Sequence, residues 1–119
     1  MKFSEMTSIA HLEDLLQKFL NETKEAAIEF SEKKTRYEDL ASKEKPLLAS
    51  LFLKKAGAIE IRKKEAEASE AYSTFLEGLS AARGEFLRAE VHYKMGLVNI
   101  DSIRSIISTR RDEIKRFQG

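Results

Sequence analysis

The most constraining pattern in the chain is a seven-residue repeat that keeps one phase from Tyr72 to Phe117. Its first column holds Tyr72, Leu79, Phe86, Tyr93, Ile100, Ile107 and Ile114, and its second holds Phe75, Ala82, Ala89, Gly96, Ile103, Arg110 and Phe117. Charged residues fill most of the other positions. A repeat of 3.5 residues keeps an apolar seam facing a neighbouring helix only if the two helices supercoil. This segment is therefore predicted to lie along another helix.

A second seam of the same kind begins at Ile9. Its two columns are Ile9, Leu16, Thr23, Phe30 and Tyr37, and Leu12, Phe19, Ala26, Lys33 and Leu40. Thr23 and Lys33 are polar exceptions, and a polar seam residue commonly specifies register or partner at some cost in stability. With Thr7 or Ser8 available as an N-cap, the first helix is predicted to cover about residues 8–44.

The clearest helix-breaking signal between the two seams lies at residues 42–46, which end in Pro46. Proline disfavours a helical conformation in the residue before it and suits the first turn of a helix. The chain is therefore predicted to turn here and to continue as one long helix, or two, over about residues 46–117. With 34% charged residues and a single proline, residues 1–119 are predicted to form one all-α domain. Its two or three long amphipathic helices would form an antiparallel helical hairpin with coiled-coil packing.

The two predicted helices differ in length, and this difference predicts self-association. At 1.5 Å per residue the first helix spans about 55 Å and an unbroken second helix about 105 Å. The later seam residues would then be exposed: Tyr93, Ile100, Ile103, Ile107, Ile114 and Phe117. Either a second copy covers them, making the protein a homo-oligomer, or the chain turns again near residues 95–102. The first alternative is favoured.

Composition narrows the class of protein further. The chain has no cysteine, which excludes disulfides and thiolate metal sites. It has no apolar run approaching the ~20 residues of a membrane span, and residues 1–10 lack a signal-peptide core. We therefore expect a cytoplasmic protein without a membrane partner. Residues 1–44 carry a net charge of −3 and residues 45–119 a net charge of +4, which suits antiparallel pairing and leaves a basic surface for a polyanion.

Enzymatic chemistry is poorly supported by the sequence. The two histidines, His11 and His92, lie on separate predicted helices without a nucleophile motif beside them. Glu90 and His92 are two residues apart, a spacing that does not place both on one face of a helix as a metal site requires. No glycine-rich phosphate loop occurs. We expect a protein that is not an enzyme and holds no metal or cofactor.

Nucleic-acid binding is the better candidate function, because cations are clustered along the second half of the chain. The candidate phosphate-binding residues are Lys54, Lys55, Arg62, Lys63, Lys64, Arg110 and Arg111. Spaced cations on a helix can follow a phosphate backbone, although a solvated helix face has the same composition. Tyr72, Phe75 and Tyr93 can in principle stack on unpaired bases. Their seam positions favour a packing role instead.

The order of these features resembles that of the UvsY-like recombination mediators of bacteriophages. A charged N-terminal helix precedes a basic stretch at residues 57–64, followed by Ala71-Tyr72 and an amphipathic C-terminal helix ending at residues 104–111. The resemblance covers about residues 33–117. It implies a helical oligomer that binds single-stranded DNA through Arg62, Lys63 and Lys64. It also implies two protein partners, a recombinase and a single-strand binding protein. The chain departs from the pattern in lacking a glycine-rich insertion after the tyrosine and in its nearly balanced charge.

Two hypotheses of function follow. The first is a non-enzymatic, phage-type recombination accessory that binds single-stranded DNA and helps to load a recombinase. The alternative is a coiled-coil adaptor, or an inhibitor, that docks a helical face on a host protein without binding nucleic acid. Salt-dependent binding of single-stranded DNA separates the two hypotheses.

Overall fold

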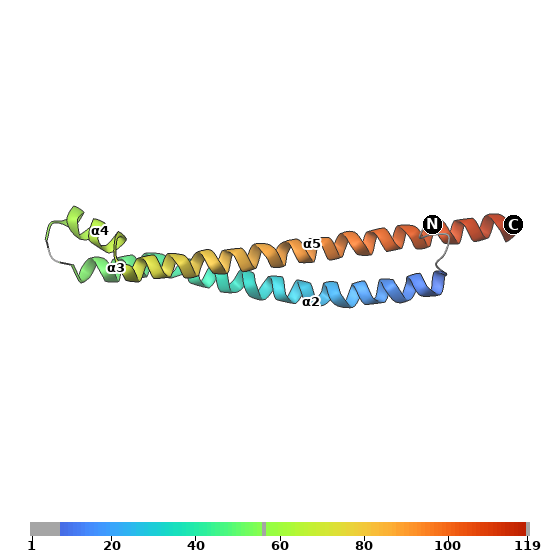
Figure 1. Cartoon of the computed structure of the whole chain (residues 1–119), viewed down its shortest axis with the longest axis horizontal. Coiled ribbons are helices and arrows are strands. Elements are labelled where there is room, and N and C mark those ends of the chain that lie inside the picture. The colour runs from blue at the N-terminus through green and yellow to red at the C-terminus, as the bar shows by residue number, and fades with distance from the viewer. Residues whose placement is uncertain (1–7, 56, 119) are drawn as a thin grey trace. The chain divides into compact units, whose positions relative to one another are not determined.

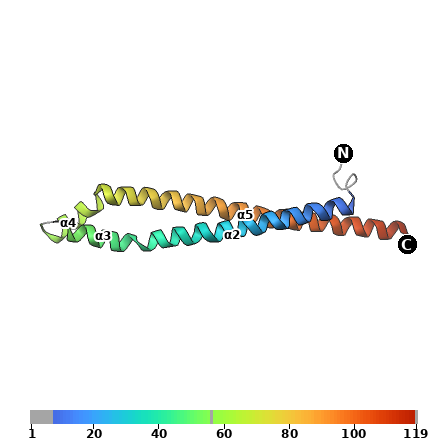
Figure 2. The same cartoon turned by 90° about the horizontal axis from the view of Figure 1, so that it is seen from below.

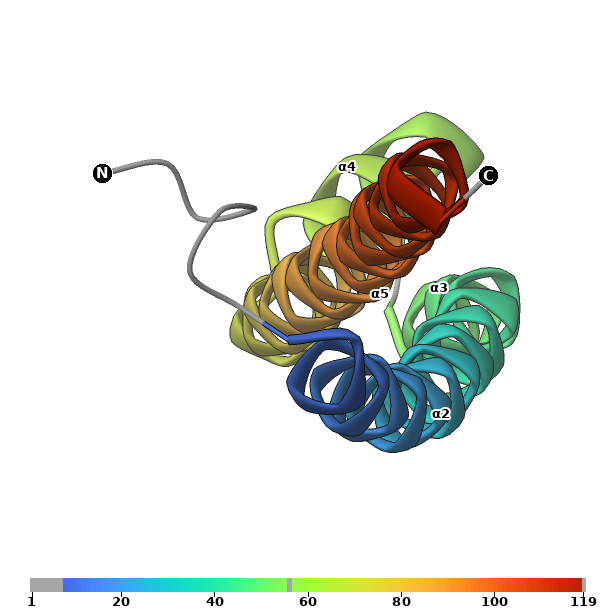
Figure 3. The same cartoon turned by 90° about the vertical axis from the view of Figure 1, so that its right-hand side faces the viewer.

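The computed structural model describes residues 8–55 and 57–118, and in this part of the chain every regular element is an α-helix. The helices are α2 (Ile9–Ser42), α3 (Glu44–Leu53), α4 (Ile59–Glu67) and α5 (Glu70–Gln118). Figures 1 and 3 show α5 as one uninterrupted helix. None of these helices, within the described residues, has the length and apolar character needed to cross a bilayer. The predicted all-α class is confirmed.

The chain divides into two compact units. Unit 1 comprises Met1–Glu29 and Ala89–Gly119, and unit 2 comprises Phe30–Arg88. In each unit a stretch of α2 pairs with an antiparallel stretch of α5, as Figures 1 and 2 both show. The predicted helical hairpin with coiled-coil packing is therefore observed.

Both predicted seams point inward. Every seam residue of α2 from Ile9 to Leu40 is buried or half-buried, and so is every seam residue of α5 from Tyr72 to Arg110. The charged residues between them are mostly exposed. The heptad pattern thus identified the face along which each helix pairs, because only residues spaced by 3.5 on average can face one neighbour over many turns.

The core of unit 1 is formed by Leu12, Ile103 and Ile107, which are no more than 6% exposed. Four half-buried side chains pack against it: Leu15, Leu16, Phe19 and Ile106. Burying each large aliphatic side chain contributes about 1.5–3 kcal/mol. This cluster therefore holds the beginning of α2 against the C-terminal part of α5.

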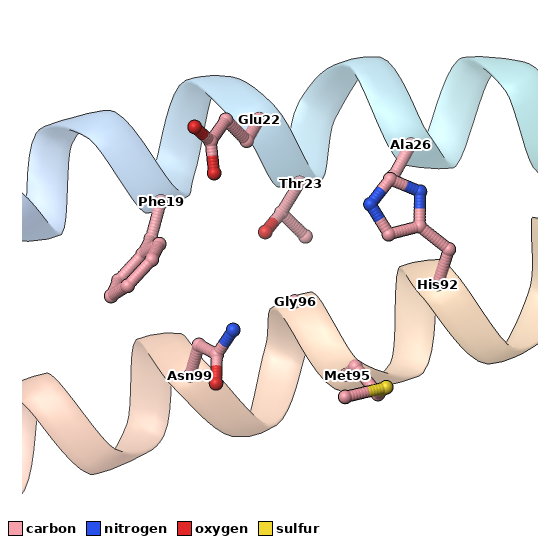
Figure 4. Close-up of a pocket in the computed structure, with 8 residues that line it drawn as sticks. All are labelled: Phe19, Glu22, Thr23, Ala26, His92, Met95, Gly96 and Asn99. Carbon is pink, nitrogen blue, oxygen red and sulfur yellow. The ribbon is translucent and has the colours of Figure 1, made fainter.

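Thr23, the polar residue in the first seam, lies directly opposite Gly96. Thr23 is 6% exposed, and a Cβ added to Gly96 would lie 3.1 Å from its Cγ2 and 3.2 Å from its Cβ. Figure 4 shows the two residues facing each other across the seam. The glycine has no side chain, so the threonine fills the space and fixes the register of the two helices.

Unit 2 is held by aromatic and ionic contacts across its own seam. The ring of Phe86 stacks on those of Phe30 and Tyr37, with 5.7 Å between ring centroids in each pair. Lys33, the second polar seam residue, places its Nζ 3.3 Å from Oε2 of Glu85. The lysine is thus accommodated by a partner on α5, in a pair that is about two-thirds buried.

Serine side chains cap two of the helices. Ser8 caps α2, since its Oγ accepts a hydrogen bond of 3.1 Å from the backbone N–H of His11. The alternative cap, Thr7, lies outside the described residues. Ser69 caps α5 in the same way, and its Oγ accepts from the N–H of Tyr72 at 3.2 Å. Gly57, with φ of +110°, lies in the turn between α3 and α4.

The predicted position of the chain reversal was wrong. At residues 42–46 the chain does not reverse: only Lys43 separates α2 from α3, and Pro46 is the third residue of α3. The backbone N–H groups in the first turn of a helix have no partner within that helix, so proline is tolerated there. Pro46 therefore lets α3 begin one residue after α2 ends, without a reversal. The reversal occurs instead between α3 and α4, where Gly57 supplies the positive φ.

The long second helix predicted over about residues 46–117 is also divided, so the predicted difference in length between the two paired helices does not hold. Residues 44–69 form α3, the turn and α4, so that α5 begins at Glu70 and stays helical through residues 95–102. The part of α5 from Ala89 to Gln118 lies beside the first half of α2 in unit 1. Contrary to the prediction, Ile100, Ile103 and Ile107 are buried within the chain.

Exposure is retained only near the end of the predicted oligomer edge. Tyr93 is half-buried, whereas Ile114 is 39% and Phe117 is 92% exposed. The first helix was predicted to be too short to cover the later seam residues, and this prediction is wrong for most of them. Homo-oligomerisation itself stays a prediction.

Candidate nucleic-acid interface

Five of the seven predicted phosphate-binding residues come together in unit 2, where α3 and α4 pack against each other. Lys54 is the C-cap of α3, and its backbone N–H reaches the carbonyl of Leu51 at 3.2 Å. Lys55 follows it in the turn, while Arg62, Lys63 and Lys64 lie on α4. The turn at Gly57 thus brings the two sequence clusters to one place. We call residues 53–55 and 57–64 the basic corner.

The four lysines of the basic corner make no ion pair with any described residue. Lys54, Lys63 and Lys64 are exposed and Lys55 is half-buried. The ion pairs observed among the described residues involve other lysines and arginines, on α2, on α5 and at Lys43 between α2 and α3. Ammonium groups without a carboxylate partner can bind an external anion without first breaking a salt bridge.

Arg62 differs from these lysines because it holds α4 to α3. Its guanidinium carbon lies 4.8 Å from the centroid of the Phe52 ring, a cation–π contact. Its Nε is buried and has no hydrogen-bond partner among the described residues. Arg62 was predicted to bind phosphate, and the structure gives it a packing role as well.

Large aliphatic side chains are exposed beside the lysines. Leu53 is 77% exposed, Ile59 is 67% exposed and Ile61 is 53% exposed. All three belong to the basic corner. Leu53 was predicted to pack on the end of the first helix, and its exposure contradicts that prediction. Ile59 and Ile61 were given no role, although their position beside Glu60 and Arg62 breaks the heptad alternation and was a usable signal. An apolar cluster surrounded by cations is typical of a binding surface.

A hollow of about 190 Å³ opens between α3 and α4 behind this surface. It is lined by Leu48, Ala49, Phe52, Lys63, Ala66 and Glu67. Its walls are mostly apolar, and Lys63 contributes the one cationic group of the lining. An apolar cavity of about 150 Å³ can bind benzene, so the volume of this hollow suits one aliphatic side chain or one small ring.

Tyr72, a predicted stacking residue, is engaged inside the protein. Its hydroxyl donates a hydrogen bond of 2.8 Å to Oε1 of Glu44. That hydrogen bond is the main cause of a raised Tyr72 pKa, to which desolvation and the charges of Glu44 and Glu67 add. Phe75 and Tyr93 are half-buried in the seam. The packing interpretation of these three aromatics agrees with their burial.

The two remaining predicted residues, Arg110 and Arg111, lie in unit 1 and have acidic partners. Nη2 of Arg111 lies 2.8 Å from Oε1 of Glu13, which joins α5 to α2. Nη1 of Arg110 lies 3.4 Å from Oε2 of Glu113. The structure therefore does not bring this pair together with the basic corner in one unit, and it gives both arginines intramolecular contacts.

Neither histidine belongs to a cluster of metal-ligating side chains within the described residues. His11 and His92 are both exposed, and no group of three or more metal-ligating side chains occurs in residues 8–55 and 57–118. His92, Glu22 and Asn99 all contribute to the lining of a hollow of about 120 Å³, in which His92 lies next to Ala26 (Figure 4). A single imidazole with one carboxylate supplies too few ligands for a tetrahedral zinc site.

Comparison of the chain with family models, with curated proteins and with solved structures gave no match.

Proposed function

We propose that this protein binds single-stranded DNA through the basic corner of unit 2 and acts as a non-enzymatic accessory of recombination. The observation that carries the proposal is a combination within residues 53–55 and 57–64: four lysines with no ion pair to a described residue, and three exposed aliphatic side chains. Lysines attract the phosphates of any nucleic acid. Aliphatic groups gain contact only where base faces are accessible, and this condition favours a single strand over a duplex.

The recombination role rests on the resemblance to UvsY-like mediators. By that resemblance the protein acts in the cytoplasm on strands coated by a single-strand binding protein, and helps a recombinase to displace that coat. The basic stretch of the resemblance coincides with α4, whose lysines belong to the basic corner. The departure noted above, a nearly balanced net charge, predicts moderate affinity that is lost at high salt.

The test is a salt series of fluorescence anisotropy with a labelled single-stranded oligonucleotide. Replacing Lys54, Lys55, Lys63 and Lys64 by Gln should lower the affinity. It should also reduce the slope of log K against log salt by about 0.7 for each lysine that contacts a phosphate. The matched control replaces four exposed lysines elsewhere, namely Lys18, Lys24, Lys34 and Lys115. Equal losses in both variants would show that net charge alone drives binding, and would remove the assigned site.

A second variant tests the preference for single strands. Replacing Leu53, Ile59 and Ile61 by Ser should weaken binding to single-stranded DNA with little change in the salt slope, because no cation is removed. Equal affinity of the unaltered protein for a duplex of the same length would contradict the single-strand assignment. Binding to anionic vesicles but not to DNA would assign the corner to a membrane surface instead.

The alternative function, a coiled-coil adaptor or inhibitor of a host protein, is favoured by the same aliphatic residues. Leu53 and Ile59 are the two most exposed large aliphatic side chains among the described residues, and an apolar groove of a partner protein would also cover them. Absence of DNA binding at low salt, with the fold intact, would leave this alternative.

A further inference from the structure

A second apolar surface lies on the outer side of α5, in unit 1, and does not belong to the seam or to the basic corner. Val91 is 57% exposed, Met95 is 60% exposed and Val98 is 62% exposed. Their spacing of four and three residues places them on one face of the helix. This face is turned away from the seam residues Tyr93, Gly96 and Ile100, although Met95, at its edge, also lines the hollow between α2 and α5.

Two side chains of opposite charge lie along one edge of this apolar face. Lys94 precedes Val98 by four residues and Asp101 follows it by three, and both are exposed. Seven residues separate them, which puts both side chains on the same edge of the face, one two turns after the other. Lys94 makes only an exposed contact of 3.4 Å with Glu90 on its own helix, and such a pair exchanges readily.

This arrangement is self-complementary under a two-fold axis. If a second α5 lies antiparallel with the axis beside Val98, residues on the same edge of the two helices meet. Lys94 of each copy then faces Asp101 of the other, and the two Val98 side chains meet at the axis. An isologous contact requires this property, because one patch must fit a copy of itself.

We propose that the outer face of α5 docks against the same face of a second copy, antiparallel and centred on Val98. The complementary charges select a second copy over an unrelated protein, because each charge finds its opposite in the same patch. Shifting the axis to Lys94 would place the two Lys94 ammonium groups together, which opposes that register. Few apolar side chains are covered in each copy, so the dimer is weak and depends on concentration.

The proposal replaces the seam as the surface for self-association. The sequence predicted an oligomer through Ile100, Ile103 and Ile107, which the structure buries within unit 1. The outer face is independent of the basic corner, so the DNA proposal and the dimer proposal can fail separately. A dimer carries two basic corners for each particle, and two linked sites bind one strand more tightly than one site.

Charge reversal provides the first test, with sedimentation velocity over a concentration series as the measurement. Asp101→Lys should weaken dimerisation at least about tenfold, because Lys94 of the partner copy then meets a like charge. Lys94→Asp should do the same, and the double variant Lys94→Asp/Asp101→Lys should restore the dimer. Glu25→Lys, an equal charge change at an exposed position of α2, is the control. A monomer at all concentrations, or a dimer that the reversals leave unchanged, would overturn the proposal.

Disulfide trapping provides the second test and reports the orientation directly. The chain has no cysteine, so single cysteines can be introduced without a background. Val98→Cys should form a covalent dimer under mild oxidation, whereas Ser31→Cys on the exposed side of α2 should not. Mixing Val91→Cys with Ser105→Cys should give mainly the mixed disulfide. Mainly like-with-like disulfides would indicate a parallel pair and would contradict the antiparallel arrangement.

Phe117→Ser distinguishes this dimer from association through the end of α5. Phe117 is 92% exposed and belongs to the edge predicted from the sequence. Dimerisation that survives this substitution, and that Val98→Glu abolishes, supports the outer face. Dimerisation lost with Phe117→Ser alone would assign it to the helix end and overturn the proposal.

Discussion

The paired helices of unit 1 bury leucine and isoleucine side chains, whereas the basic corner of unit 2 exposes side chains of the same types. Leu12 is fully buried and Ile107 is 5% exposed, whereas Leu53 is 77% and Ile59 is 67% exposed. The difference lies in what each residue has beside it. In unit 1 a seam on a second helix covers the aliphatic groups, while the short α3 and α4 leave theirs in solvent. Stability should therefore be concentrated in the former region and binding in the latter.

The largest expected effect compares the same substitution in the two regions. Leu12→Ala should lower the free energy of unfolding by about 2–5 kcal/mol, because it leaves a cavity against Ile103 and Ile107. Leu53→Ala should change it by less than about 0.5 kcal/mol, since the side chain is already in solvent. Urea denaturation monitored by circular dichroism measures both. Similar losses from the two variants would contradict the contrast drawn between the regions.

The next comparison concerns two glycines of α5 with different surroundings. Gly78→Ala should raise the free energy of unfolding by about 1 kcal/mol, the difference in helix propensity, because a Cβ there meets nothing within 4 Å. Gly96→Ala should lower it by about 1 kcal/mol, since crowding against Thr23 outweighs the same gain.

Thr23→Ala supplies the control for the glycine comparison. Combined with Gly96→Ala it removes the hydroxyl and methyl groups that the new Cβ would meet. The double variant should therefore be more stable than the sum of the single effects predicts, a coupling of about 1 kcal/mol. Additive effects would mean that the register does not depend on this contact.

The seams were predictable because they depend on periodicity over many turns. Thr23 and Lys33 were recognised as polar exceptions in the seam. Their partners on α5, Gly96 for Thr23 and Glu85 for Lys33, could be identified only once the facing helix was known. The position of the reversal was not predicted, because Pro46 gave a stronger sequence signal than Gly57. A proline in the first turn is compatible with a helix, whereas a positive φ at glycine redirects the chain.

The candidate site was predictable in part for a similar reason. Clusters at residues 54–55 and 62–64 were identified from composition, but their proximity required the turn that joins α3 to α4. The stacking of Arg62 on Phe52 was not foreseen, because it joins residues ten apart on different helices. The capping role of Ser69 was likewise missed. A serine followed by an acidic residue, Glu70, was the available signal for a new helix.

A smaller effect is expected from the ionic contacts of unit 2. Glu85→Gln removes the partner of both Lys33 and Arg36, at 3.3 Å and 3.8 Å. It should cost about 0.5–1 kcal/mol of unfolding free energy, and the loss should shrink as salt is added. Glu38→Gln is the control, because its pair with Lys34 is long and exposed and should contribute almost nothing. A loss that does not change with salt would mean that Glu85 acts by packing.

The smallest expected effect is the pH dependence that Tyr72 brings to unit 2. Its pKa is raised above the usual 10.0 in the folded state, chiefly because the hydroxyl donates to Glu44. The stabilisation is therefore fully present below the unfolded-state pKa and is lost as the pH rises through the raised pKa. Titration of tyrosinate absorbance should show one transition shifted to higher pH, which Tyr72→Phe abolishes and Glu44→Gln moves back toward 10.0. If the shifted transition persists in the Glu44→Gln variant, the hydrogen bond that ties α5 to α3 is not its cause.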